Sequence, residues 1–263
     1  MSRYLGQHFL KNKSAINSII QALDIQPNET VVEIGPGEGA LTLPLAEACE
    51  KIGGRLIAIE KDRNLAGALP QKIKNVEVIT GDALKELATP KSYILNSKSW
   101  KLVGNIPYYI TGKLLRVIGE LEQKPSLVVL MIQKEVAERL SAQPPSMNLL
   151  AAATQIWSKP EILLNLKPKD FNPPPEVDSS VIKLEIELKI KEKKALEAYY
   201  RLIKAAFKQP RKTLLNNLST GLEMPKEKIL EIVKKCGLTG EERAQNLSLN
   251  DLQKLLTFLP FGN

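Results

Sequence analysis

The 263-residue chain has few of the residues that build disulfide frameworks or metal centres. It contains one histidine and two cysteines, Cys49 and Cys236, which stand far apart and form no Cys-x-x-Cys pair. Neither a disulfide framework nor a zinc site is therefore expected, and we predict no metal. Free cysteines of this kind are typical of a reducing compartment, so we expect a cytoplasmic protein.

Long apolar runs are also missing. The longest runs, such as Leu127–Ile132, are far shorter than the roughly 20 apolar residues that span a bilayer. No apolar signal region follows the first methionine, and we expect no association with a membrane. Hydrophobic residues still make up 43% of the chain, which is enough to build a folded core.

Acidic residues are fewer than basic residues, and the difference varies along the chain. The chain has 37 basic and 29 acidic residues, a net charge of +8. Residues 1–180 contain 21 basic and 19 acidic side chains, whereas residues 181–263 contain 16 and 10. The basic excess lies mainly in the last third of the chain. It favours a polyanionic partner, although a basic surface can also serve solubility alone.

The pattern of apolar segments in the first two thirds predicts an α/β fold. Short β-branched runs indicate strands buried on both faces, and the amphipathic runs between them indicate crossover helices, as in a doubly wound, Rossmann-like sheet. The expected strands are Val31–Ile34, Leu56–Ile59, Val76–Thr80, Lys101–Val103 and Leu127–Met131, and the expected helices are Ala40–Lys51, Thr111–Leu121 and Lys134–Ser141. Glu161–Leu166 and Ser180–Leu188 then indicate an antiparallel strand pair.

Beyond Lys189 the pattern becomes helical. The expected helices are Lys191–Lys208, Pro225–Cys236 and Leu249–Phe258. A proline at a helix start and Gly237 after a helix end agree with this interpretation. We therefore divide the chain into an α/β domain at residues 1–189 and a small all-helical domain at residues 190–263.

A glycine loop joins the first predicted strand to a helix. Residues 31–39 read VVEIGPGEG, with glycine at alternate positions, so Gly35 and Gly37 let the backbone approach a ligand closely. The spacing differs from the Gly-x-Gly-x-x-Gly of dinucleotide sites, and Glu33 would repel a pyrophosphate. The loop favours a cationic cofactor without phosphate, although a tight turn without function has the same composition.

Acidic residues follow the next two predicted strands. Glu60 ends one strand, where a carboxylate accepts hydrogen bonds from ribose hydroxyls, and Asp82 follows the next, where it can accept an adenine amine. Either acid alone could instead cap a helix. Because parallel strands end at one edge of a sheet, the loop and both acids together predict a nucleoside pocket. The absence of a phosphate-binding lysine favours S-adenosylmethionine over ATP.

The fourth predicted strand is followed by Asn105-Ile106-Pro107-Tyr108. The lone pair of an amine on a purine is delocalised into the ring, so acceptors against its N–H groups are needed to make the nitrogen nucleophilic. The Asn105 amide oxygen and the Ile106 carbonyl suit that role, Pro107 stiffens the turn, and Tyr108 can stack on an extruded base. These residues predict the catalytic loop of an adenine methyltransferase, with a structural proline turn as the alternative.

Together these motifs resemble the ribosomal RNA adenine dimethyltransferase family, and within it most closely the enzymes of small-subunit (16S) RNA. The resemblance covers nearly the whole chain and is carried by residues 5–10, 33–42, 105–110, 131–139, 171–179 and 243–248. It implies a class I S-adenosylmethionine-dependent methyltransferase fold, dimethylation at N6 of two neighbouring adenosines, the small ribosomal subunit as partner and a role in its biogenesis. A monomer is the default expectation.

The resemblance also implies roles for single residues. The residues that it places against the cofactor are His8, Leu10, Gly35, Glu60, Asp82 and Asn105. The family more often has asparagine at the position of His8. Phe171 is similar to a second aromatic wall that would enclose the target adenine with Tyr108.

Basic residues in the helical tail predict RNA contacts. Arg201, Lys204 and Lys208 share one face of a predicted helix, and Arg211 and Lys212 follow without an intervening acidic residue. Such charge is usually a solvated face. Because the chain also resembles a family of RNA methyltransferases, we expect these five side chains to bind an RNA backbone.

Three alternatives stay open. A large-subunit methylase would share the chemistry and differ in which ribosomal RNA gains methyl groups. A DNA or protein-glutamine methyltransferase would carry an Asn-Pro-Pro-Tyr loop, and Ile106 in place of the first proline counts against it. An assembly or transcription factor could keep the fold without catalysis, but the intact Glu60, Asp82 and Asn105 count against lost activity.

Overall fold

The computed structural model describes residues 8–89 and 99–260. The described residues form two compact units, which we treat separately. Of the described residues, the first unit contains 8–89, 99–137 and Lys159–Ile186, and the second contains Glu138–Ser158 and 187–260. No helix among the described residues is long and apolar enough to cross a membrane.

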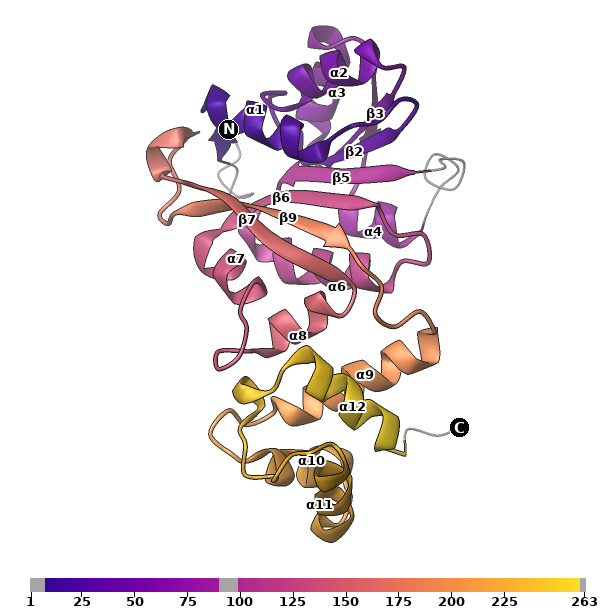
Figure 1. Cartoon of the computed structure of the whole chain (residues 1–263). Coiled ribbons are helices and arrows are strands. Elements are labelled where there is room, and N and C mark those ends of the chain that lie inside the picture. The colour runs from indigo at the N-terminus through magenta and orange to yellow at the C-terminus, as the bar shows by residue number, and fades with distance from the viewer. Residues whose placement is uncertain (1–7, 90–98, 261–263) are drawn as a thin grey trace. The chain divides into compact units, whose positions relative to one another are not determined.

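A seven-stranded sheet forms the centre of the first unit (Figure 1), in the order β4-β3-β2-β5-β6-β9-β7. Its strands are β2 (Thr30–Ile34), β3 (Arg55–Glu60), β4 (Val76–Thr80), β5 (Trp100–Asn105), β6 (Leu127–Gln133), β7 (Ser158–Leu166) and β9 (Ser179–Ile186). The strands β2 to β6 pair in parallel. The chain adds β3 and β4 on one side of β2 and then β5 and β6 on the other, so the predicted doubly wound sheet is confirmed. Its switch point lies at the carboxyl ends of β2 and β5.

The last two strands of the sheet run in opposite directions. β9 is antiparallel to β6 and lies beside β7. Ser180 Oγ donates to Asn165 Oδ1 at 2.6 Å, and Lys183 Nζ lies 4.0 Å from Glu161 Oε2. Residue numbers therefore rise along one strand as they fall along the other, and the predicted antiparallel pair is confirmed.

Helices cover both faces of the sheet (Figure 1). One face carries α1 (Lys13–Leu23), α2 (Thr42–Lys51) and α3 (Arg63–Lys72), and the other carries α4 (Ala83–Ala88) and α6 (Thr111–Glu120). Because both faces are covered, the central strands are apolar, and six of the seven residues of β6 are buried. The helix α1 was not predicted from the sequence pattern, and its apolar stripe packs into the core through Ile16, Ile19 and Leu23.

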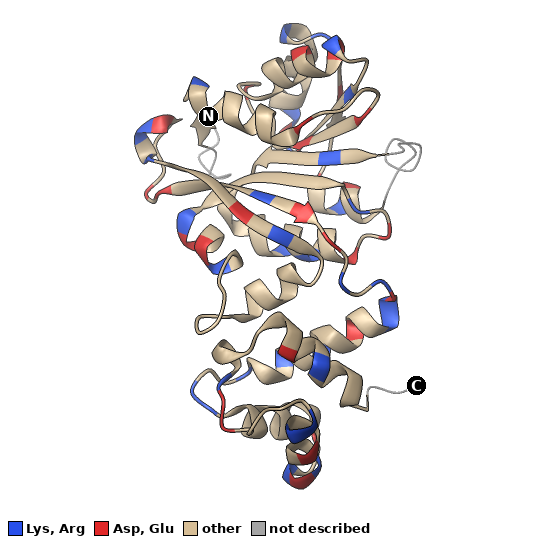
Figure 2. Cartoon of the chain, viewed as in Figure 1, with Lys and Arg blue, Asp and Glu red and all other residues tan. Residues whose placement is uncertain are grey.

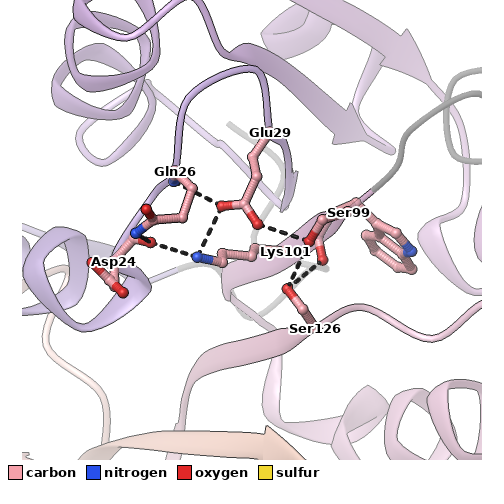
Figure 3. A network of polar contacts seen from close by, with 7 residues as sticks. Asp24, Gln26, Glu29, Ser99, Lys101 and Ser126 are labelled. Carbon is pink, nitrogen blue, oxygen red and sulfur yellow. Dashed lines mark hydrogen bonds and ion pairs between the residues drawn. The ribbon is translucent and has the colours of Figure 1, made fainter.

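A buried ion pair joins the amino ends of β2 and β5, at the sheet edge opposite the carboxyl ends (Figure 3). Lys101 Nζ lies 2.9 Å from Glu29 Oε2, and both side chains are less than a tenth exposed. Lys101 also donates to the backbone carbonyl of Asp24 at the end of α1, and Ser99 Oγ donates to Glu29 Oε1 at 2.7 Å. The pair thus ties the end of α1 to the starts of two strands.

The second unit is built from helices. They are α8 (Leu149–Gln155), α9 (Lys193–Ala206), α10 (Leu214–Leu222), α11 (Lys226–Lys235) and α12 (Leu249–Phe258). Tyr199 of α9 is fully buried and donates its hydroxyl to the carbonyl of Ala152 in α8 at 3.1 Å. The packing therefore divides the chain differently from the expected boundary at residue 189. Residues 138–158 join the helical unit because α8 packs against α9.

Candidate active site

A cavity of about 820 Å³, counted with its open mouth, lies at the carboxyl ends of β2, β3, β4 and β5. This is the edge at which doubly wound sheets bind ligands. All the residues predicted to bind cofactor or to act in catalysis line this cavity, except Leu10 and Phe171. The structure therefore brings together residues that the sequence places at four separate strand ends.

The glycine loop passes the floor of the cavity in a conformation that favours glycine. Gly35 and Gly37 have φ angles of +67° and +58°. A Cβ atom on Gly37 would lie 2.6 Å from Phe9 Cε1, so the ring of Phe9 rests directly on the loop backbone. Phe9 lies in the motif of residues 5–10 but was not predicted as a site residue, and it belongs to the two-residue strand β1 (Phe9–Leu10). A strand this short has no periodic signal.

Glu60, the last residue of β3, is only 4% exposed. Its Oε2 accepts a hydrogen bond from the Gly37 N–H at 3.1 Å, and its Oε1 accepts one from the Asp62 N–H at 2.8 Å. A carboxylate has about four acceptor positions, so about two remain for ligand hydroxyls. The cap of α3 is Asp62, which removes the helix-cap explanation for Glu60.

Asp82 both caps a helix and lines the cavity. Its Oδ1 accepts a hydrogen bond from the Leu84 N–H at 3.0 Å at the start of α4, and its Oδ2 lies 3.0 Å from Lys61 Nζ. Partial burial raises the pKa of Asp82, but the hydrogen bonds from Lys61 and Leu84 bring it below its ordinary value. Asp82 is therefore a carboxylate at neutral pH. Lys61 balances its charge, and this residue was not predicted from the sequence.

Glu33 lies beneath the glycine loop and is 1% exposed. Its Oε2 has no hydrogen-bond partner among the described residues. Burial raises the pKa of Glu33 to about 8, opposed by the nearby Thr42 hydroxyl and reinforced by Glu60. Glu33 is thus mostly protonated at neutral pH. The acidic residues that line the cavity are Glu60 and Asp82, and Glu33 is not one of them.

Asn105 and Tyr108 are both fixed by contacts to distant segments. Asn105 Nδ2 donates to the carbonyl of His8 at 2.6 Å, which leaves Oδ1 as an acceptor for a ligand. The Tyr108 hydroxyl lies 2.7 Å from Ser179 Oγ. The His8 and Tyr108 rings lie 22° from parallel with centroids 6.3 Å apart, and His8 Nδ1 lies 2.9 Å from the Pro173 carbonyl.

Leu10 and Phe171 pair with each other rather than lining the cavity. β1 is antiparallel to β8 (Phe171–Asn172), with Leu10 opposite Phe171. Their side chains are 4% and 1% exposed and belong to the core beneath α1. The ring that faces Tyr108 among the described residues is His8. The stacking of Phe171 on the target adenine stays a prediction. In the structure, Phe171 is buried and pairs with Leu10 of β1.

The predicted RNA-binding residues of the second unit are all exposed. Arg201, Lys204 and Lys208 line a hollow with Glu223, where Gly221 of α10 packs against Ala205 of α9. Arg211 and Lys212 lie in the turn between these two helices, which is blue in Figure 2. No group of three or more metal-binding side chains occurs among the residues that the structure describes.

Comparisons with known proteins agree with this geometry. Residues 1–259 match the family model of ribosomal RNA adenine dimethylase. The chain is 39% identical over 255 residues to ribosomal RNA small subunit methyltransferase A of Dehalococcoides mccartyi, covering 95% of this chain and 86% of the relative. It is 37% identical over 276 residues to the protein of that name from Pelotomaculum thermopropionicum, covering 98% and 91%.

Two solved structures share the fold. A dimethyladenosine transferase from Plasmodium falciparum is 28% identical, with a TM-score of 0.78 over 94% of this chain and 96% of that chain. The 23S rRNA methyltransferase ErmE is 24% identical, with a TM-score of 0.75 over 95% and 99%. At that identity, the second likeness concerns the fold alone.

Proposed function

Because the chain belongs to the ribosomal RNA adenine dimethylase family, we propose that it methylates N6 of two adjacent adenosines in small-subunit (16S) ribosomal RNA, with S-adenosylmethionine as methyl donor. The observation that carries the proposal is the convergence of Glu60, Asp82 and Asn105 on one cavity from three strand ends. The product is N6,N6-dimethyladenosine. Relatives named for the small subunit favour that RNA over the large-subunit one.

The donor set of the cavity fits S-adenosylmethionine. The carboxylates of Glu60 and Asp82 face it, and its lysine, Lys61, is paired with Asp82 rather than free to bind a phosphate. We assign the ribose hydroxyls to Glu60, the adenine amine to Asp82, and close backbone contact to Gly35 and Gly37. His8 and Leu10 complete the set by resemblance to the family. When bound, this cofactor supplies a methyl group activated by a sulfonium.

The catalytic loop prepares the amine of the target adenine. Asn105 Oδ1 and the Ile106 carbonyl accept hydrogen bonds from its two N–H groups, which draws the nitrogen towards tetrahedral geometry. Pro107 holds the loop, and Tyr108 stacks on the base. With S-adenosylmethionine held by Glu60 and Asp82, its methyl group would pass to this nitrogen and S-adenosylhomocysteine would be left. A proton leaves the nitrogen afterwards, when the alkylated nitrogen is strongly acidic, so no general base is required.

We assign RNA binding to the helical unit. The side chains that carry it are Arg201, Lys204, Lys208, Arg211 and Lys212, whose exposure and shared charge suit contacts to phosphates. The partner that we infer is the small ribosomal subunit, bound by a monomer of this chain. A ribosomal substrate places the reaction in the cytoplasm and links it to subunit biogenesis.

The experiment is methyl transfer to small subunits that lack these methyl groups. Purified protein and labelled S-adenosylmethionine are incubated with small or large subunits, and the RNA is digested and analysed by mass spectrometry. We expect dimethyladenosine in 16S RNA alone, and a much slower appearance of it with the Asn105→Ala variant. Transfer to large-subunit RNA instead, or no transfer while the cofactor still binds, would overturn the proposal.

A further inference from the structure

Four exposed lysines lie on two segments that are far apart in the sequence and meet in the folded chain. They are Lys11 and Lys13 near the amino end, and Lys167 and Lys169 in the turn between β7 and β8. The Lys11 N–H donates to the Asp170 carbonyl at 2.9 Å, which holds the two segments together. We call these four side chains the lysine rim.

Basic charge is concentrated at the rim. Residues 8–13 and 166–172 contain four lysines and one acidic residue, a net charge of +3. Residues 1–180 as a whole contain 21 basic and 19 acidic residues, a net charge of only +2. The rest of that region therefore carries a net charge of −1.

The acidic neighbours of the rim are already engaged. Asp170 Oδ2 accepts from the Lys167 N–H at 2.8 Å, and Asp170 Oδ1 accepts from Asn12 Nδ2 at 2.9 Å. Asp178 Oδ2 lies 2.6 Å from Lys167 Nζ. Lys11, Lys13 and Lys169 form no ion pair with another described residue. Lys11 and Lys169 lie near enough to Asp170 to help lower the pKa of its carboxyl, but they do not pair with it directly, so their exposed ammonium groups can still contact a ligand.

Lys13 stands where a helix disfavours a cation. It is the first residue of α1, at the end of the helix dipole that is partially positive, and the first turn of α1 contains no acidic residue. Asn12 caps the helix without offsetting this charge. Lys13 therefore destabilises the start of α1 without forming a contact that compensates. Such a residue indicates a role other than in folding.

The rim lies next to the cavity because β1 connects them. His8 and Phe9 line the cavity, and Lys11 comes two residues after Phe9. A strand rises about 3.3 Å per residue, so the backbone of Lys11 lies roughly 7 Å along the chain from that of Phe9. Lys169 likewise stands two residues before Phe171, the partner of Leu10 in the small sheet.

We propose that the lysine rim docks the RNA backbone on either side of the target adenosine. The inference rests on the proposed function. A base rotated into the cavity leaves its flanking phosphates outside it, where ammonium groups can bind them. Such contacts set the register of the strand without reading its sequence. The rim is therefore a second RNA surface, within the catalytic unit and separate from the basic residues of the helical unit.

The test is the full-length double variant Lys11→Gln/Lys169→Gln. We measure its binding to unmethylated small subunits over a salt series, the KM and kcat of methyl transfer, and the Kd for S-adenosylmethionine. The slope of log K against log salt should fall by roughly 0.7 to 0.9 for each phosphate that the variant no longer binds. The KM for the subunit should rise about tenfold, by the same electrostatic reasoning, while the cofactor Kd holds.

The matched control is Lys74→Gln/Lys159→Gln, which removes the same charge at the amino ends of β4 and β7, away from the cavity. If the salt slope and the KM of the double variant equal those of the control, the lysine rim does not bind RNA. Methylation by the wild type would still support the proposed function in that case. If the glutamine variant loses cofactor affinity, the variant Lys11→Arg/Lys169→Arg tests the proposal instead, because it keeps both positive charges. Failure of this charge-preserving variant to restore the wild-type salt slope would equally refute the proposal.

Discussion

Asn105 at the end of β5 donates a 2.6 Å hydrogen bond to the backbone carbonyl of His8, 97 residues earlier in the chain. This bond determines the orientation of the Asn105 amide, because its nitrogen is used and its oxygen is left for a ligand. It also connects the catalytic loop to the segment that carries Phe9 onto the glycine loop. The proposed catalytic loop and the proposed cofactor loop are therefore both in contact with the segment of His8 and Phe9.

Removing the Asn105 side chain should affect the chemical step. Asn105→Ala deletes the acceptor for the substrate amine, and we expect kcat to fall by about 100-fold to 1000-fold, as for loss of one oxyanion-hole group. Single-turnover methyl transfer measures it. Asn105→Asp keeps an acceptor but sets an oxygen against the His8 carbonyl, so it should also weaken cofactor binding in calorimetry. A kcat within about threefold of wild type in Asn105→Ala would contradict the assigned role.

Tyr108 should act through its ring. Tyr108→Ala removes stacking worth about 1 to 3 kcal/mol, so methyl transfer should fall by roughly 5-fold to 150-fold in kcat/KM. Tyr108→Phe keeps the ring and removes only the hydroxyl that meets Ser179. Ser179→Ala is the matched control, and it should resemble Tyr108→Phe. Equal losses in the alanine and phenylalanine variants would show that the hydroxyl, and not stacking, matters.

Glu33 should make stability fall as pH rises. Burial raises its pKa from 4.5 to about 8 in the folded chain, so the native state binds this proton more tightly than the unfolded state. Its contribution is full below about pH 4.5 and is lost as the pH rises to about 8, on the order of 5 kcal/mol in all. Urea unfolding at several pH values measures it. Glu33→Gln should remove this slope, and an identical slope in both proteins would refute the assignment.

The buried Glu29–Lys101 pair should be costly to break from one side. Lys101→Met leaves a buried carboxylate without its cation, and we expect the free energy of unfolding to drop by about 3 to 5 kcal/mol. Glu29→Gln/Lys101→Met should recover much of this loss, because no charge is then left unpaired. The control is the exposed pair of Arg55 and Glu77, at 3.0 Å, where Arg55→Met should cost under about 1 kcal/mol. If chemical denaturation shows similar losses of unfolding free energy for Lys101→Met and Arg55→Met, burial does not make the Glu29–Lys101 pair costly to break.

The helical unit should bind RNA through charge. Reversing both residues in Arg211→Glu/Lys212→Glu should weaken binding to small subunits, with a smaller salt slope and an unchanged cofactor Kd. Lys226→Glu/Lys228→Glu on α11 makes the same charge change at two other exposed positions. Binding that is unaffected across the salt series, or equally weakened by the control pair, would refute a specific role for Arg211 and Lys212.

Much of the site could be predicted because its residues follow strands that are apolar enough to recognise. The glycine loop, Glu60, Asp82 and Asn105 each follow such a run. A parallel doubly wound sheet has to end these strands at one edge, so topology alone brings them together. The antiparallel pair after residue 160 was recognisable for the same reason, since alternation and a short connection leave few other arrangements.

Other features depend on contacts between distant parts of the chain. The pairing of Leu10 with Phe171 joins segments 161 residues apart through strands of two residues, too short to show a period. It turns Phe171 into core and leaves His8 to face Tyr108. Residues 138–158 join the helical unit because Tyr199 packs on α8.

The sequence alone determined the sheet, the strand ends and the class of ligand, because local pattern and spacing encode them. Only the tertiary structure decided which acids are charged, since burial raises the pKa of Glu33 to about 8 while hydrogen bonds hold the pKa of Asp82 below its usual value. It also decided that the lysines near the amino end lie next to those before β8, because β1 pairs with β8. Burial and long-range pairing belong to the packed chain, and no local pattern specifies them.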